Sequence, residues 1–467
     1  MGPKEERKAR KNLIWGGIND FHFGTCEFIE YCREIGAEPC LVVNLSTGSP
    51  DEAANWVEYC NGTENTYYAN LRRSHGYPEP FGVKYWALGN EEGAEPDAGR
   101  HQDPRKYVED VWHFIKLMKL TDPSIKLIAN GEGGDMRWNE TILDGLGGAV
   151  DYISYHNYVN TEEGKPYSLF RKIKAADRGL AALGAFIREN CPDSVDNWQV
   201  WYRFPPRQDR IRIAFDEWGI WEAGGPPYGT TNTYEWRHGL ATAYFLNAIH
   251  RNARHVGIAN WAQMVNILAP IMTASVRQTA FFPLREYRAK GLKESVKAEA
   301  VSPAMDTDVG SLDVSATIDR ERGRLNLFVV NLNPKALKTR IVFENCKADK
   351  LIRRKPSVFD SPFHKKGKFS WKTRPGTSSQ RPRTPIRERR TKSRSRGNPS
   401  RFASSRSPAD DLRDSRRRPG IFPHAGLLSH AGLFPDAGRG RPGRIFYRRE
   451  LAHNPIFPIF VERLNTA

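Results

Sequence analysis

The sequence predicts an α/β fold, a (β/α)8 TIM barrel with two of its strand–helix units missing, followed by a partial antiparallel β-sandwich and a disordered basic tail. Three observations support this expectation. Strand-type and helix-type patterns alternate between residues 25 and 285, two apolar strand-type runs end in a carboxylate, and the composition changes near residues 296 and 353.

Six strand-type runs alternate with amphipathic helical patterns along the first part of the chain. Such alternation is typical of a parallel sheet covered by helices, and eight units would close a barrel. The expected strands are Pro39–Leu45, Val83–Leu88, Ile125–Asn130, Val150–Tyr155, Ile211–Phe215 and Val256–Trp261.

Start and stop signals place the helices between these strands. We expect Thr25 to cap a first helix that stops at Gly36, and Ser49-Pro-Asp-Glu52 to begin a second through a capping box. Further helices are expected from Asp103-Pro104 onward, over Leu169–Asn190 and over Tyr234–His250.

The pattern becomes β-rich after the last of these units. Runs at 312–318, 324–330 and 339–343 alternate or are rich in β-branched residues, and Asp319–Gly323 is a polar hairpin connection. We therefore assign residues 1–290 to the partial barrel, residues 291–352 to the partial β-sandwich and residues 353–467 to the tail.

The net charge of +17 belongs almost entirely to the tail. From residue 371 onward there are 22 Lys and Arg against 7 Asp and Glu, so the first 370 residues hold 49 basic and 47 acidic residues. The basic residues from 371 onward are 20 Arg and 2 Lys, among Pro, Gly and Ser. Two interpretations stay open: a gene-model artefact from a shifted reading frame, or a real segment that binds RNA or other polyanions.

Composition excludes several classes of protein. No run of about 18 apolar residues exists, so no membrane span is expected. The charged start has no apolar signal segment, which indicates a cytoplasmic chain as it stands, although an intact parent could be secreted. No cysteine pair has metal-binding spacing and no glycine loop cradles phosphate, so we expect no cofactor and no metal. The sequence leaves open whether the chain forms a homo-oligomer.

Two apolar runs end in glutamate: Lys84-Tyr-Trp-Ala-Leu-Gly-Asn-Glu91 and Arg212-Ile-Ala-Phe-Asp-Glu217. The carboxyl ends of parallel barrel strands converge at one face of the barrel, so Glu91 and Glu217 should lie near each other. A pair of carboxylates is the minimum equipment for hydrolysis of a glycosidic bond.

The sequence resembles glycoside hydrolase family 51, the α-L-arabinofuranosidases, over roughly residues 13–345. The segments that carry the resemblance are 23–28, 35–39, 43–48, 55–62, Trp86–Glu91, Asp151–Ser154, His156, Tyr158, Asp216–Trp218, Trp221 and Ala262–Pro270. Nothing matches the family's first two strand–helix units, so we expect the barrel to lack those two.

The resemblance implies a retaining enzyme that releases terminal non-reducing α-L-arabinofuranosyl residues from arabinoxylan, arabinan or their oligosaccharides. It implies that Glu91 is the acid/base and that Glu217 is the nucleophile. The residues that it implies bind the substrate are Asn90, His156, Tyr158, Trp221 and Gln263. Glu91 then needs a raised pKa, whereas Glu217 must stay ionised, helped by a hydrogen bond from Tyr158.

Other interpretations remain open for this set. His156 could merely buttress the site, and Trp221 could be a core residue. Another retaining enzyme of the same clan is a near neighbour in function. The alternative from a different class is a catalytically impaired fragment that binds carbohydrate, or polyanions through the tail. We expect no membrane partner, and we expect binding to nucleic acid only through the tail.

Overall fold

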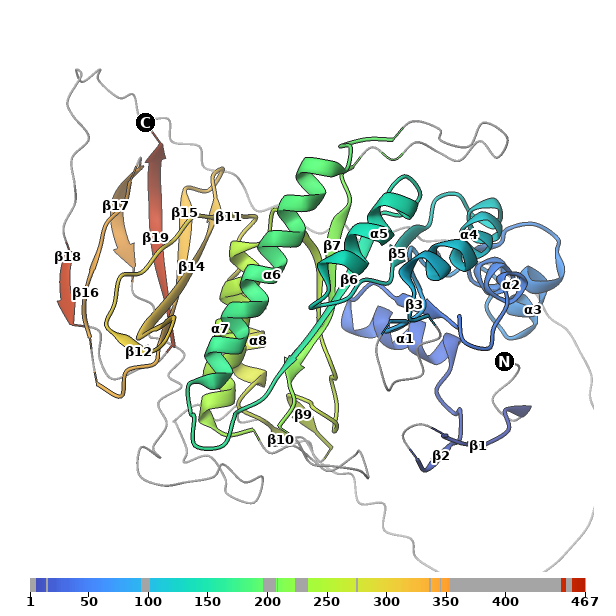
Figure 1. Cartoon of the computed structure of the whole chain (residues 1–467), viewed down its shortest axis with the longest axis horizontal. Helices are drawn as coiled ribbons and strands as arrows, with labels where there is room; N and C mark the ends of the chain where they lie inside the picture. The colour runs from blue at the N-terminus through green and yellow to red at the C-terminus, as the bar shows by residue number, and fades with distance from the viewer. Residues whose placement is uncertain are drawn as a thin grey trace, which may run out of the picture. The chain divides into compact units, whose positions relative to one another are not determined.

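A six-stranded parallel sheet forms the first part of the molecule (Figure 1). The computed structural model describes residues 6–13, 16–93, 101–195, 207, 209–222, 234–273, 276–335, 337–344, 346–352, 447–450 and 456–466. The strands lie in the order of the chain: β3 (Cys40–Val43), β4 (Tyr85–Leu88), β5 (Lys126–Ala129), β6 (Tyr152–Val159), β7 (Arg212–Ile220) and β8 (Val256–Trp261). All six predicted strands are confirmed.

Helices follow the strands, as parallel connections require. They are α1 (Thr25–Ile35), α2 (Pro50–Asn61), α3 (Tyr67–Ser74), α4 (Pro104–Thr121), α5 (Met136–Leu146), α6 (Ser168–Asn190), α7 (Trp236–Arg251) and α8 (Phe281–Lys290). The large core contains Trp86, Leu127 and Phe215, whereas the alternate positions Ala87, Ile128 and Ala214 form a separate small cluster. The inner strands β4, β5 and β7 therefore bury both of their faces, which explains their nearly continuous apolar runs.

The predicted start of α2 is confirmed and that of α1 needs a correction. Ser49 accepts a hydrogen bond from the backbone N–H of Glu52, and Pro50 occupies the first turn. Thr25 does not cap α1, because Gly24 occupies the cap position. The Thr25 hydroxyl instead accepts a hydrogen bond from Trp56 Nε1 at 3.2 Å. This side chain therefore joins α1 to α2 rather than capping α1.

Helices α3, α5 and α8 were not expected from the sequence. Of these, α5 begins where Asp135 accepts hydrogen bonds from two backbone N–H groups, after the glycine-rich segment 131–134. Because glycines are typical of a loop, the sequence of that segment did not indicate that a helix begins at Asp135. Its buried side chains include Ile142 and Leu146, which join the large core.

Strands β6 and β7 extend beyond the predicted ends. The sequence placed the end of β7 at Phe215, but the strand continues through Asp216 and Glu217 to Ile220. Its register with β6 shifts between Ser154 and His156, so that His156 lies opposite Glu217. Glu217 therefore lies within a strand rather than at its end. Hydrogen bonds from Ser154 and Tyr158 on β6 stabilise Asp216 and Glu217 inside the sheet.

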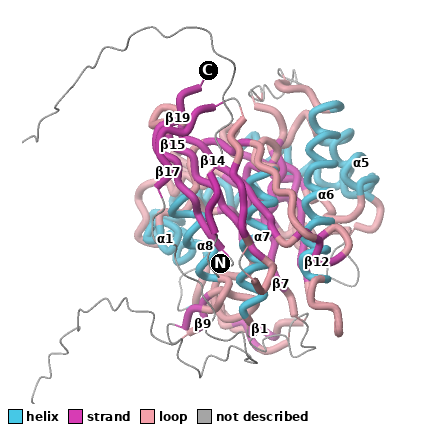
Figure 2. The backbone as a smooth tube through the Cα atoms, turned by 90° about the vertical axis from the view of Figure 1, so that its left-hand side faces the viewer, coloured by secondary structure: helices cyan, strands magenta, loops and turns pink. Residues whose placement is uncertain are grey.

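A five-stranded antiparallel sheet follows, in the order β11 (Glu294–Val296), β14 (Leu312–Asp319), β15 (Arg324–Asn331), β19 (Ile456–Thr466) and β17 (Cys346–Ile352). Strands β14, β15, β17 and β19 lie side by side in Figure 2. The predicted hairpin is confirmed, because Asp319 pairs with Arg324. Short pairs are β1 (Arg10–Lys11) with β2 (Ile18–Asn19), β9 (Ile271–Met272) with β10 (Val276–Arg277), β12 (Ala304–Asp306) with β13 (Val309–Gly310), and β16 (Lys338–Ile341) with β18 (Tyr447–Glu450).

Two segments of the expected tail are strands, which corrects the prediction of disorder for them. Strand β19 contains the apolar run 456–461, and its backbone pairs with both β15 and β17. Such a run can complete a sheet although the surrounding composition is polar. Residues 353–446 and 451–455 of the tail lie outside the described residues.

A partly buried polar network joins α7 to the antiparallel sheet. Arg251 Nη1 donates to Asp313 Oδ1 at 2.9 Å, and its other amino group pairs with Asp177 Oδ2 at 2.9 Å. Asn247 Nδ2 donates to Asp313 Oδ2 at 2.7 Å. Burial raises the pKa of Asp313, although Arg251 and Asn247 oppose that rise. None of the described helices is long and apolar enough to cross a membrane.

Candidate active site

A tight turn after β4 sets the position of Glu91. Gly89 has a φ of +84°, and a side chain there would collide with Leu45 and Glu92. Glu91 itself has a φ of +48°, in the left-handed region that a non-glycine residue rarely occupies. Surrounding structure must hold such a conformation, and strained backbone of this kind clusters at functional sites.

Buried hydrogen bonds anchor the next residue, Glu92. His101 Nδ1 lies 2.8 Å from Glu92 Oε2, and His101 Nε2 lies 3.1 Å from Asp110 Oδ2. The backbone N–H of Glu92 donates to Asn130 Oδ1 at 2.5 Å. Glu92 therefore points away from Glu91 and fixes the turn between β4 and α4.

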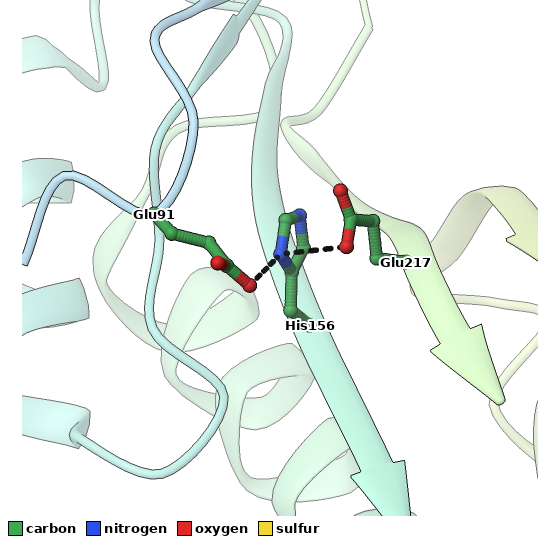
Figure 3. Close-up of side chains that lie close together, drawn as sticks. All are labelled: Glu91, His156 and Glu217. Carbon is green, nitrogen blue, oxygen red and sulfur yellow. Dashed lines mark hydrogen bonds and ion pairs between the residues drawn. The ribbon is translucent and has the colours of Figure 1, made fainter. Parts of the chain in front are cut away.

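His156 lies between the two glutamates that the sequence singled out (Figure 3). Its Nδ1 is 2.8 Å from Glu91 Oε1 and 3.6 Å from Glu217 Oε2. Its Nε2 is 3.4 Å from Asp216 Oδ1, so three carboxylates surround one imidazole. The prediction that Glu91 and Glu217 come together is correct.

Two hydroxyl groups hold the carboxylates of β7. Tyr158 Oη donates to Glu217 Oε2 at 2.7 Å, and Ser154 Oγ donates to Asp216 Oδ1 at 2.7 Å. Both donors belong to β6, the neighbouring strand. Because each carboxylate is held from the adjacent strand, the orientation of Glu217 is fixed before any ligand arrives.

The two glutamates are close enough to act on one bond. An oxygen of Glu91 and an oxygen of Glu217 lie within 4.8 Å of each other. Carboxyl groups about 5–5.5 Å apart are typical of retaining glycosidases, whereas inverting enzymes need about 6.5–9.5 Å to admit a water. Both side chains remain partly accessible, 27% for Glu91 and 31% for Glu217, so a ligand can reach them.

The charges of this cluster support one another. Burial opposes protonation of His156, but the hydrogen bonds to Asp216 and Glu91 outweigh it and raise its pKa to about 10. Burial raises the pKa of Glu217, while the His156 charge and the Tyr158 hydrogen bond oppose that rise. The expected bond from Tyr158 is therefore present, and it stabilises the ionised form of Glu217.

Glu91, His156 and Glu217 also have a spacing that a metal ion could use. The hydrogen bonds to Asp216 and Glu91 that raise the pKa of His156 favour its imidazolium form, which carries a proton on each ring nitrogen. Its Nδ1 lies at hydrogen-bond distance from Glu91 Oε1. An ion-paired cluster explains the geometry without a metal.

Trp221 follows the last residue of β7 and lies at the border of the site. Its ring meets the ring of Tyr158 edge to face, with centroids 5.4 Å apart, and its backbone N–H donates to Val159 O at 2.9 Å. The next residue, Glu222, accepts hydrogen bonds from Thr161 and lies 2.9 Å from His238 Nε2. Burial opposes the charge of Glu222, but His238 and Thr161 lower its pKa to about 2.

The structure therefore joins Glu91, His156, Tyr158, Glu217 and Trp221 in one cluster. Asn90 and Gln263 are exposed, next to Glu91 and just after β8, and take no part in that cluster among the described residues. One member of the site had been given no role from the sequence: Asp216, whose only signal was its place beside Glu217.

Comparison with known proteins gives consistent results over both halves of the chain. Residues 1–175 match the alpha-L-arabinofuranosidase 1 domain, and residues 216–379 match the alpha-L-arabinofuranosidase C-terminal domain. The chain is 36% identical over 362 residues to the probable alpha-L-arabinofuranosidase C of Aspergillus niger, covering 71% of this chain and 69% of that protein. It is 31% identical to the intracellular exo-alpha-(1->5)-L-arabinofuranosidase 1 of Bacillus subtilis, covering 73% and 71%.

Solved structures show the same fold. The α-L-arabinofuranosidase of Thermotoga maritima, in its arabinose complex, superposes with a TM-score of 0.65 at 32% identity, covering 75% of this chain and 73% of that one. The thermostable GH51 enzyme of Thermotoga petrophila gives a TM-score of 0.63 at 32% identity, covering 73% and 71%. The predicted fold class, a partial (β/α)8 barrel followed by a β-sandwich, is confirmed.

Proposed function

The chain belongs to glycoside hydrolase family 51, the α-L-arabinofuranosidases, and we propose that it cleaves terminal α-L-arabinofuranosyl residues with retention of configuration, using Glu91 and Glu217. One observation carries the mechanistic part of the proposal. Oxygens of the two carboxylates lie within 4.8 Å of each other, which is closer than the separation of about 6.5–9.5 Å that inverting enzymes need and suits direct attack by one of the carboxylates.

In the first step, Glu217 is the nucleophile. Its ionised carboxylate attacks the anomeric carbon, while protonated Glu91 gives its proton to the glycosidic oxygen, and the bond to the leaving alcohol breaks. Tyr158 and the charged His156 favour the ionised form of Glu217 against the burial that raises its pKa. The product of this step is an arabinofuranosyl ester of Glu217.

In the second step, Glu91 acts as a base. Its carboxylate takes a proton from water, the resulting hydroxide attacks the anomeric carbon, and the ester bond to Glu217 breaks. Two inversions give net retention. His156 Nδ1, which donates to Glu91 Oε1, stabilises the ionised state that Glu91 has between the two steps.

The other predicted residues are proposed to bind the sugar. Asn90 precedes the acid/base and carries donor and acceptor groups for a hydroxyl, Trp221 offers an apolar face, and Gln263 follows the end of β8 and carries a side-chain amide. We propose arabinan, arabinoxylan and their oligosaccharides as substrates. The Bacillus subtilis relative is named for α-(1→5)-linked arabinofuranoside, which makes arabinan oligosaccharides the first substrates to assay.

Azide rescue separates the two roles. With an activated aryl α-L-arabinofuranoside, Glu91→Ala in azide should give the arabinosyl azide with retained configuration, because azide replaces water in the second step. Glu217→Ala in azide should give the inverted azide, because azide replaces the nucleophile. The control is Glu163→Ala, an exposed carboxylate beyond β6, which should behave as the parent chain. The same azide anomer from both variants would refute the assignment.

The alternative is a protein that binds arabinosyl ligands without cleaving them. It is favoured by one observation: within the described residues, β3 pairs only with β4 and β8 pairs only with β7, so the parallel sheet is open at both edges. Turnover of an aryl arabinofuranoside that is lost in Glu217→Ala supports the hydrolase. Saturable arabinose binding without turnover supports the alternative.

A further inference from the structure

Glu222 binds the end of β7 to two neighbouring elements. The backbone N–H of Thr161, two residues beyond β6, lies 3.2 and 3.3 Å from its two carboxylate oxygens, and the Thr161 hydroxyl donates to Oε1. His238 Nε2, in the first turn of α7, lies 2.9 Å from the same Oε1. One side chain therefore joins the ends of β6 and β7 to the start of α7.

The imidazole of this junction is buried and is bound at both of its nitrogens. His238 is 1% exposed, and its Nδ1 accepts the backbone N–H of Glu235 at 2.7 Å, while its Nε2 faces Glu222. Such a ring cannot turn without breaking a hydrogen bond and leaving a buried polar group unpaired, which costs stability. The position of the Glu222 carboxylate is therefore set by a rigid partner.

Trp221 belongs to a run of three residues that are each bound by a different neighbour. Before it, the carbonyl of Ile220 accepts from the hydroxyl of buried Tyr234 at 2.8 Å. Trp221 itself donates its backbone N–H to Val159 O at 2.9 Å. After it comes Glu222 with the contacts described above. The backbone that carries the Trp221 ring is thus fixed on both sides.

The ring of Trp221 is coupled to the proposed nucleophile through Tyr158. Tyr158 pairs in register with Gly219, which places it between Glu217, two residues earlier, and Trp221, two residues later. Its hydroxyl donates to Glu217 Oε2 at 2.7 Å, and its ring meets the Trp221 ring edge to face at 5.4 Å. A displaced Trp221 would therefore change both the apolar face offered to the sugar and the packing of the donor to Glu217.

We propose that Glu222 is a positioning residue that acts through Trp221: its contacts with Thr161 and His238 fix the Trp221 ring where the arabinofuranosyl group of the substrate binds. The carboxylate of Glu222 is bound to protein groups, and the reaction needs no third acid or base. The inference rests on the proposed function, since it takes Trp221 as part of the sugar site.

A double-mutant cycle on kcat/KM tests whether Glu222 acts through Trp221. Glu222→Ala should lower kcat/KM for an aryl α-L-arabinofuranoside by roughly 10- to 100-fold, because a misplacement of about 1 Å can cost that much. In a chain that already carries Trp221→Ala, adding Glu222→Ala should cost less than about twofold, because the ring that Glu222 positions is gone.

Thr161→Val is a smaller change with a matched control. It removes the hydroxyl that donates to Glu222 and keeps the shape of the side chain, so it should lower kcat/KM by roughly threefold or more, and only where Trp221 is present. Thr141→Val removes a hydroxyl that donates to Arg137 O within α5, and it should match the parent chain.

Each outcome decides the matter. Equal fractional losses from Glu222→Ala with and without Trp221 overturn the proposal, because that pattern indicates a merely structural role. If Glu222→Ala does not melt cooperatively, the same cycle with Thr161→Val provides the decision. Failure of the proposed function is seen separately, as no turnover by the parent chain, and the cycle is then measured on the Kd of L-arabinose. A parent chain with neither turnover nor arabinose binding overturns both proposals.

Discussion

Replacing Tyr158 by Phe tests the electrostatics of the site most sharply among single-atom changes. The substitution removes only the hydroxyl that donates to Glu217 Oε2 at 2.7 Å. The ring and its edge-to-face contact with Trp221 are retained. The change therefore measures how much one hydrogen bond, from the Tyr158 hydroxyl, stabilises the Glu217 carboxylate.

The magnitude follows from the nature of this hydrogen bond. A bond to a charged group contributes about 1.5–3 kcal/mol, which corresponds to a loss of about 10- to 150-fold in kcat/KM if the bond is intact in the transition state. Tyr158 favours the ionised form of Glu217, whose pKa burial already raises. Without Tyr158 that pKa rises further, so the acidic limb of the pH profile should move to higher pH, by roughly one unit.

The assay measures kcat/KM for an aryl α-L-arabinofuranoside from about pH 4 to about pH 9. This range includes the ordinary pKa values of a carboxyl group and an imidazole, about 4 to 7. The matched control is Tyr155→Phe, the same change on the same strand, where the ring packs on Phe215 in the buried core. We expect the control to leave the profile in place. An acidic limb that moves to lower pH in Tyr158→Phe, or that moves equally in both variants, would refute this reasoning.

Two further predictions concern stability. Arg251→Met leaves buried Asp313 without its cation, so urea unfolding should show a loss of about 2–3 kcal/mol, whereas Arg178→Met, at a pair more than half exposed, should lose less than about 0.5 kcal/mol. The pKa of Glu222 is lower in the folded chain, at about 2, so its contribution is present at neutral pH and is lost as pH falls toward 2. Glu222→Gln should flatten the acid dependence of Tm below about pH 5 and Glu163→Gln should not; equal acid dependence in both would contradict the ion pair.

The parallel sheet could be predicted because its signals are local. Apolar runs such as Val83–Leu88, with Ser49 and Asp103 as caps, determine strands and helix starts from neighbouring residues alone. The end of β7 could not be found in the same way. Asp216 and Glu217 have the composition of a boundary, yet donors from β6 stabilise them inside the sheet.

Five of the predicted site residues come together in the structure, but of their contacts only the hydrogen bond from Tyr158 to Glu217 was expected. That two apolar runs lead into a glutamate is visible in the sequence, whereas the contacts of His156 with both glutamates depend on a register shift between β6 and β7.

The central claim is that Glu217 forms a covalent bond with the sugar. Incubation with a slow 2-fluoro arabinofuranoside that has a good leaving group, followed by peptide mass spectrometry, tests it directly. The account predicts one fluoroarabinosyl adduct, on the peptide that contains Glu217, and none in Glu217→Ala. An adduct on another carboxylate, or steady hydrolysis with no adduct and inverted product, would contradict it.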